Sequence, residues 1–170
     1  IKEDERASWY SHKAEIARPY YYRAYLADYD VGVEIAPTTR AASFRFTFPE
    51  SSKSWILLDA FDKGSMVAIL PKDRRIVGYA RNNSGGVPAN FRNYFVVQFD
   101  HDFEVTHSWT DGWKLTPGAL KAQGKHVGAA IGFKTRRGEQ INARVASSAG
   151  KNVSTASSDS VTSSGVPNTS

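Results

Sequence analysis

Three acidic residues alternate along one short stretch, at Asp100, Asp102 and Glu104. Side chains two positions apart in an extended strand point to the same face, so these carboxyl groups could meet on one side of a sheet. Hydrolysis of a glycosidic bond uses such a pair, with one group as acid and the other as base or nucleophile. Carboxylates between two strands are also ordinary solvated turn residues. We favour the second interpretation, because nothing in the spacing aims two of these groups at one bond.

Two histidines, His101 and His107, lie six positions apart in the same stretch. In a regular strand they would share a face, and two histidines can bind a metal when a third ligand joins them. Neither an HxH nor an HExxH motif accompanies them, so the sequence predicts no metal site. The chain has no cysteine, which excludes disulfides, thiolate catalysis and cysteine-based zinc sites.

The stretch 81–90, RNNSGGVPAN, combines paired glycines, a proline and three asparagines, which is typical of a long loop. Its backbone N–H groups could face an anion, but it lacks the spacing and the lysine of a phosphate-binding loop and no helix follows it. Loops of this composition also bind sugars through their amide side chains. Asn82 and Asn90 are therefore candidate substrate-binding residues.

Two of the four tryptophans, Trp109 and Trp113, lie in a segment without regular strand signals, residues 109–124. A tryptophan in such a place either plugs the end of a β-sandwich or stacks on a sugar ring. The plug is favoured, and both residues stay candidates for substrate contact beside Asn82 and Asn90. Trp55 lies in a continuous apolar run and is predicted to be a core residue.

The scaffold that must position these residues is predicted to be all-β. Phe44, Phe46 and Phe48 alternate with polar residues, which is the pattern of a half-buried strand. About ten closely spaced segments have strand signals, and none has a convincing helical pattern. The sequence predicts an antiparallel β-sandwich, with one hairpin over residues 43–59 and a final hairpin over residues 127–145.

Length and composition limit the remaining alternatives. The 170 residues, 41% of them hydrophobic, suffice for one domain with a sizeable core, and no apolar run approaches the length of a membrane span. The net charge of +5 comes from scattered basic residues, so nucleic-acid binding is not favoured. We expect a linker remnant at residues 1–8, the sandwich at 9–146 and a disordered Ser/Thr-rich tail at 147–170. The charged start without an initiating Met indicates a piece of a longer product or a processed form.

Several consecutive segments resemble the N-terminal domain of glycoside hydrolase family 92, the calcium-dependent exo-α-mannosidases. These segments, which occur in the family's order and spacing, are 11–22 (S-H-x-x-E-x-A-x-P-x-Y-Y), 34–40 (E-I-A-P-T-T-R), 46–49 (F-T-F-P), 56–59 (I-L-L-D), 85–91 (G-G-V-P-A-N-F) and 94–100 (Y-F-x-x-x-F-D). Together they cover most of residues 9–146. Each short motif alone is weak, but a chance match of this extent is not expected.

The resemblance implies a supersandwich-like β-domain that packs against a separate (α/α)₆ catalytic domain. In that family the catalytic acid and base and most of the calcium site belong to the catalytic domain, so we expect no catalytic residue and no metal ligand in these 170 residues. The expected partners are that domain and a mannose-containing glycan, and the expected location is secreted or periplasmic. The alternative function is a free-standing carbohydrate-binding or structural β-module.

Overall fold

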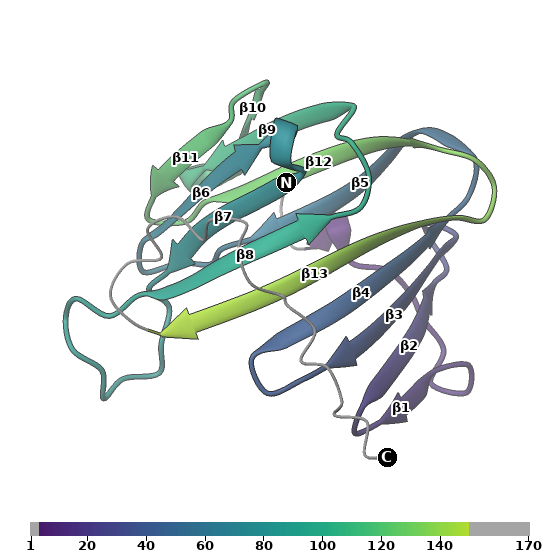
Figure 1. The fold of residues 1–170 in the computed structure, drawn as a ribbon, viewed down its shortest axis with the longest axis horizontal. Helices are drawn as coiled ribbons and strands as arrows, with labels where there is room; N and C mark the ends of the chain where they lie inside the picture. Colours follow the sequence, from purple (N-terminus) through teal and green to yellow (C-terminus); the bar gives the residue numbers. More distant parts are fainter. Residues whose placement is uncertain (1–3, 150–170) are drawn as a thin grey trace, which may run out of the picture.

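The computed structural model describes residues 4–149, and its strands form two antiparallel sheets packed as a sandwich (Figure 1). The strands are β1 (Ile16–Arg18), β2 (Tyr21–Leu26), β3 (Val31–Pro37), β4 (Ala41–Phe48), β5 (Ser51–Asp59), β6 (Ser65–Leu70), β7 (Arg75–Ala80), β8 (Asn93–Phe99), β9 (Val105–Thr110), β10 (Lys114–Pro117), β11 (Lys121–Gly124), β12 (Gly128–Thr135) and β13 (Glu139–Ala149). Short 3-10 helices lie at Asp4–Arg6, Pro71–Asp73 and Asp111–Trp113. The predicted fold class is confirmed.

The large sheet has nine strands in the order β1-β2-β3-β4-β13-β8-β7-β6-β11, and the small sheet has four in the order β10-β9-β12-β5. Strand β13 lies inside the large sheet, where it pairs with β4 on one side and β8 on the other. The last strand of the described residues therefore joins the first four strands to the rest of the sheet. The central position of β13 is visible in Figure 1.

The core lies between the two sheets and follows the alternation of their strands. Phe44, Phe46 and Phe48 share one face of β4, with ring centroids 6.1 Å and 6.3 Å apart along the series. Ile141 of β13 pairs across from Phe46 and is fully buried. Phe133 of β12 belongs to the same core cluster and reaches it from the small sheet. The predicted aromatic face of residues 43–48 is confirmed.

The two predicted hairpins are wrong, because their strands belong to different sheets. β4 lies in the large sheet and β5 in the small one, and β12 and β13 are divided in the same way. The chain crosses from sheet to sheet at residues 49–50 and again at 136–138. In the sequence, a hairpin and a crossing between two sheets have the same signal, a polar turn between two apolar runs. In either arrangement the two strands can bury a face in the same core.

The prediction of an irregular segment at residues 109–124 is also wrong. Strands β10 and β11 occupy much of it. β10 is an edge strand of the small sheet, and β11 is an edge strand of the large sheet. The sequence of β11, KAQG, has little intrinsic strand preference, and its pairing with β6 comes from tertiary contact. The turn before β10 contains Gly112 and Trp113, both at positive φ.

Trp55 is not a core residue, contrary to the prediction. Its side chain is 37% exposed and packs against His107, with ring centroids 5.1 Å apart. On β5 it is the neighbouring residues Ser54 and Ile56 that pack inward, toward Thr135 and the core cluster respectively. Because residues 55–58 are apolar on both faces, the sequence does not show which of them face inward.

The small sheet covers only part of the large one. The main contacts between the sheets join β12 to β6 and β9 to β11, so the inner face of β2–β4 extends beyond the small sheet. In Figure 1 these strands, in purple and blue, form a wing at one end of the molecule. Strand β13 continues to Ala149, and the rest of the predicted tail, residues 150–170, lies outside the described residues. Within residues 4–149 no helix is long and apolar enough to cross a membrane.

Gly128 provides a test of the packing on the outer face of the small sheet. A Cβ atom at this position would lie 2.0 Å from the Trp109 ring and 2.4 Å from the Leu58 carbonyl oxygen. We expect Gly128→Ala to lower the free energy of unfolding by about 2 to 3 kcal/mol, because neither neighbour can move away freely. Thermal and urea denaturation measure the change.

Gly32→Ala is the matched control, because a Cβ there would meet Thr47 at an ordinary 3.6 Å. Equal stability of the Gly128 and Gly32 variants would contradict the close packing of Trp109.

Candidate functional site

The predicted carboxylates lie in the connection between β8 and β9, and the structure does not bring them together as a pair. Asp100 accepts hydrogen bonds from the Asn142 side chain (2.6 Å) and from the Asn142 backbone N–H (2.9 Å). Asp102 is 95% exposed, with an oxygen 3.8 Å from Arg74. Glu104 precedes β9 and is exposed. The three residues precede the regular strand, so the alternation does not place them on one strand face.

The two histidines have different surroundings. His101 lies beside Asp100, with Nδ1 2.6 Å from its carboxylate, and its Nε2 is 3.6 Å from Glu139. His107 lies on β9 against Trp55. The predicted shared strand face is wrong, because β9 begins only at Val105. No group of three or more acidic or histidine side chains in the described part of the chain could hold a metal ion.

The asparagine-rich stretch is a loop between β7 and β8, as predicted. Its conformation is stabilised by Asn83, whose side chain donates to the Arg81 carbonyl oxygen (2.8 Å) and accepts from the Gly85 N–H (2.9 Å). Asn82 and Asn90 are exposed on this loop. Both side chains are accessible to a ligand, and their assignment to substrate binding stays a prediction.

The two candidate tryptophans stack on each other, with ring centroids 6.3 Å apart. Trp109 is 1% exposed and packs over Gly128, so its ring is not available to a sugar unless its neighbours move. Trp113 lies above it and is partly exposed. Trp109 is therefore a packing residue in this structure. Substrate contact by Trp113 stays a prediction.

A charged cluster that no sequence motif indicates holds the N-terminal segment against these rings. Arg6 donates a hydrogen bond to the Asp59 carboxylate (2.6 Å), and its guanidinium carbon lies 5.1 Å from the centre of the Trp113 ring. His126 Nε2 lies 2.6 Å from the other Asp59 oxygen. These residues come from distant parts of the sequence, so no local spacing indicates their contact.

Asp59 is the most buried acid of this cluster, with a side chain that is 12% exposed. Burial alone would raise the pKa of Asp59. Hydrogen bonds from Arg6, from the Phe61 backbone N–H and from His126 outweigh burial and lower the pKa below its ordinary value. Asp59 is therefore ionised throughout the neutral range and holds the N-terminal segment in place.

The charged cluster around Asp59, with the Trp113 ring beside it, and the asparagine-rich loop flank the same short connection between β5 and β6. Gly64 in this connection donates to the Lys125 carbonyl oxygen (2.9 Å), next to His126, and accepts from the Arg81 N–H (3.0 Å), next to Asn82. The accessible candidates Asn82 and Trp113 thus belong to one end of the sandwich.

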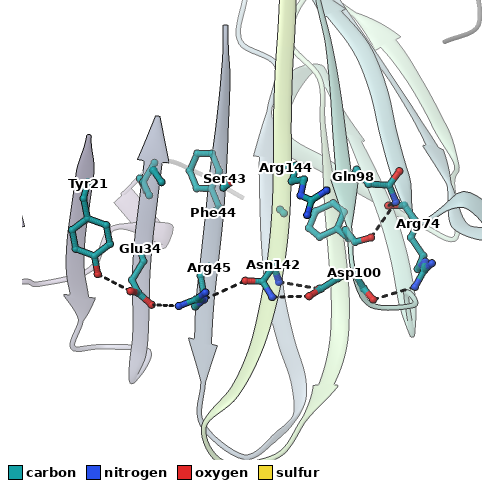
Figure 2. A pocket seen from close by; sticks show the side chains of 14 residues that line it. Tyr21, Glu34, Ser43, Phe44, Arg45, Arg74, Gln98, Asp100, Asn142 and Arg144 are labelled. Carbon is teal, nitrogen blue, oxygen red and sulfur yellow. Dashed lines mark hydrogen bonds and ion pairs between the residues drawn. The ribbon is translucent and has the colours of Figure 1, made fainter. Parts of the chain in front are cut away.

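A second group of polar side chains runs across the outer face of the large sheet (Figure 2). We call it the polar row, and its members, in spatial order, are Tyr21, Glu34, Arg45, Asn142 and Asp100. Tyr21 donates to Glu34 (2.6 Å), whose other oxygen lies 3.6 Å from Arg45. Arg45 in turn donates to the Asn142 side-chain oxygen (3.3 Å). The row lines an open hollow of about 640 Å³.

The hydrogen bonds of the polar row determine its charge state. The hydrogen bond to Glu34 raises the pKa of Tyr21, so the phenol stays a donor. At the other end, burial would raise the pKa of Asp100, but the hydrogen bonds from Asn142 and His101 outweigh it and lower the pKa. Asp100 is therefore ionised at neutral pH, and neighbouring donors hold both carboxylates of the row.

An apolar hollow of about 630 Å³ lies on the other side of the molecule, around the edge strand β5. It reaches from the uncovered inner face of β2–β4 to the outer face of the small sheet. Its apolar lining includes Leu26, Val33, Phe46, Trp55, Leu57 and Leu115. The polar hollow and the apolar hollow therefore lie on different surfaces of the domain.

The profile of the glycosyl hydrolase family 92 N-terminal domain matches residues 1–148. The chain belongs to this family. The resemblance of its sequence motifs is thereby confirmed, and a comparison with curated proteins finds no match.

Solved structures of family 92 enzymes have the same fold as this N-terminal domain. A family GH92 inverting mannosidase from Bacteroides thetaiotaomicron is 32% identical, with a TM-score of 0.80 over 85% of this chain. A family GH92 alpha-mannosidase from the same organism, solved in complex with mannoimidazole, is 31% identical, with a TM-score of 0.72 over 83%. This chain spans only 19% and 20% of those two proteins, which are larger and carry further domains.

The Asp59 cluster of this family 92 domain predicts a pH-dependent stability. We expect Asp59→Asn to lower the free energy of unfolding by about 2 kcal/mol at pH 7, because it removes charge-assisted hydrogen bonds in a mostly buried place. A carboxyl group whose pKa is lowered by folding stabilises the folded state at pH values above its pKa in the unfolded chain, about 3.9. This contribution is lost as the pH falls through the pKa of the group in the folded state. The variant and the natural chain should therefore converge below about pH 4.

Denaturation at a series of pH values measures this difference. Asp102→Asn is the control, because Asp102 is almost fully exposed and its removal should leave the stability unchanged. A constant difference between the Asp59 variant and the natural chain down to pH 2 would contradict the proposed role of the Asp59 charge.

Proposed function

We propose that this chain is the N-terminal, non-catalytic domain of a calcium-dependent, inverting exo-α-mannosidase that acts on mannose-containing glycans. The family match over residues 1–148 is the observation that carries this proposal. The structural relatives support it, because two of them are mannosidases of family GH92 and one of these is an inverting enzyme.

Inverting hydrolysis requires two carboxyl groups far enough apart to admit a water molecule between them and the sugar. Asp100 is engaged with Asn142 and Asp102 faces solvent, so these two do not form such a pair in the chain. Calcium sites draw several of their oxygen ligands from carboxylates, and no group of three or more acidic or histidine side chains within residues 4–149 could hold a metal ion. The proposal therefore assigns catalysis and calcium binding to the rest of the enzyme.

The physical role we propose for the domain is to bury an apolar surface against the catalytic domain. The apolar hollow around β5 is suited to this, because Phe46, Trp55 and Leu57 line it within a larger apolar surface. Family 92 relatives have about four-fifths of their length outside the part that matches this chain, which is ample to cover such a surface.

We further propose that Asn82, Asn90 and Trp113 wall one side of the substrate pocket. Their support is their accessibility and their position at one end of the sandwich. A secreted or periplasmic location fits an enzyme that trims glycans outside the cytoplasm. The exposed amide side chains of the asparagine-rich loop also favour a second candidate function, that of a free-standing carbohydrate-binding module.

The first test is hydrolysis of an α-linked mannobiose by the purified chain, with and without added calcium. We expect no release of mannose in either condition, because Glu34 is engaged with Tyr21 and Arg45, Asp100 is engaged with Asn142, and Asp102 faces solvent. A full-length family 92 mannosidase serves as the positive control. Saturable mannose binding without hydrolysis would favour the carbohydrate-binding module.

Calcium-dependent release of mannose by the chain alone would overturn the proposal of a non-catalytic domain. Asp100, Asp102 and Glu104 would then be the first residues to replace, since they are the clustered carboxylates between β8 and β9.

A further inference from the structure

We propose that the hollow beside the polar row binds a carboxylate group of an acidic glycan, with Arg144 as the residue that recognises the charge. This surface is separate from the end of the sandwich where Asn82 and Trp113 lie. The inference does not depend on the proposed mannosidase function, because it concerns a binding event without hydrolysis.

The outer face of the large sheet has an excess of positive charge that the sequence does not reveal. Strand pairing places six basic side chains and one acidic side chain, Glu34, on this face, and Asp100 adds a second carboxylate at the end of the polar row. The basic residues are Arg18, Arg23, Arg45, Arg75, Lys121 and Arg144. In the sequence they are scattered over more than a hundred residues, and only the antiparallel register brings them to one surface. The face attracts anions by long-range electrostatics.

The hollow itself results from small side chains between larger ones. The pairings Ala36–Ser43, Ser43–Arg144 and Arg144–Gln98 form a line across β3, β4, β13 and β8, next to the polar row. Ala36 and Ser43 leave space above the sheet, while Tyr21 and Arg144 rise on either side of it (Figure 2). At a strand spacing of about 4.8 Å, Tyr21 on β2 and Arg144 on β13 are about 14 Å apart across the sheet, which suits a short oligosaccharide.

Arg144 differs from the other guanidinium groups of the hollow in having no hydrogen bond or ion pair to another residue within 4–149. Arg45 is engaged with Glu34 and Asn142, and Arg74 donates to the Asp100 carbonyl oxygen. The side chain of Arg144 is exposed at the wall of the hollow. Its N–H donors are therefore available to a ligand.

The charge balance of the hollow favours a carboxylate as the ligand group. Its lining has three guanidinium groups against the two carboxylates of Glu34 and Asp100, which suits one negative charge better than a dianionic phosphate. The planar fork of an arginine forms two parallel hydrogen bonds with a carboxylate. The Ser43 hydroxyl and the Gln98 side-chain oxygen lie on the same line and are suited to sugar hydroxyls, since the Gln98 amide nitrogen is already donating to backbone carbonyls.

The test is a calorimetric titration of the full chain with a linear oligogalacturonate of four residues, compared with a neutral mannotetraose. We expect saturable binding of the acidic oligosaccharide and at least tenfold weaker binding of the neutral one. Raising the salt concentration should weaken the binding, because it screens an exposed charge contact. A sulfated oligosaccharide of the same length is the third ligand.

Substitutions at two basic positions separate a specific contact from general charge attraction. Arg144→Gln should weaken oligogalacturonate binding at least tenfold. Lys114→Gln, which removes a positive charge from the small sheet, should change the affinity for oligogalacturonate less than twofold. Arg144→Lys should weaken oligogalacturonate binding several-fold, because lysine keeps the charge of arginine but not its planar fork of donors. Both positions are exposed, so the variants should fold.

Three results would overturn the proposal: no binding of the oligogalacturonate, equal binding of the neutral oligosaccharide, or equal losses in the Arg144→Gln and Lys114→Gln variants. Tighter binding of the sulfated oligosaccharide than of the oligogalacturonate would overturn the assignment to carboxylate. None of these results bears on mannose hydrolysis, so a failure here is distinguishable from a failure of the proposed function.

Discussion

The pairing of β13 with β4 on one edge and β8 on the other is the interaction on which the rest of the structure depends. Among the described strands, it is β13 that pairs the wing formed by β1–β4 with the rest of the large sheet. Ile141 and Ala143 on its inner face are buried in the core, while Asn142 and Arg144 on its outer face line the polar hollow. A shift of one residue in its register would exchange these two sets, so burial of the core also fixes the positions of the polar groups.

Much of the fold could be predicted from the sequence, since alternation and turn signals depend on local spacing. The Phe44–Phe48 strand and the asparagine-rich loop are examples. The sequence does not indicate that β5 and β12 belong to a second sheet, because the turns at residues 49–50 and 136–138, where the chain crosses between the sheets, have the composition of hairpin turns. It also placed Trp55 in the core, since a run that is apolar on both faces gives no inward direction.

The site residues were harder to predict than the fold for a related reason. The spacing of Asp100, Asp102 and Glu104 suggested a shared face, but the three residues precede the strand and the alternation therefore has no meaning there. The contacts that do form, such as Arg6 with Asp59 and Arg45 with Asn142, join residues 53 and 97 positions apart. Contacts of this separation are set by tertiary structure, so no local spacing in the sequence indicates them.

The two hollows indicate how one small domain can meet two different partners. The apolar hollow around β5 exposes large side chains to water, and covering it with protein would gain the free energy of their burial. The polar row gains little from being covered, because its charged groups already satisfy one another and would lose their contact with water. A catalytic domain is therefore expected on the apolar side. The outer face of the large sheet then stays open to solvent, where Arg144 is accessible to a charged glycan.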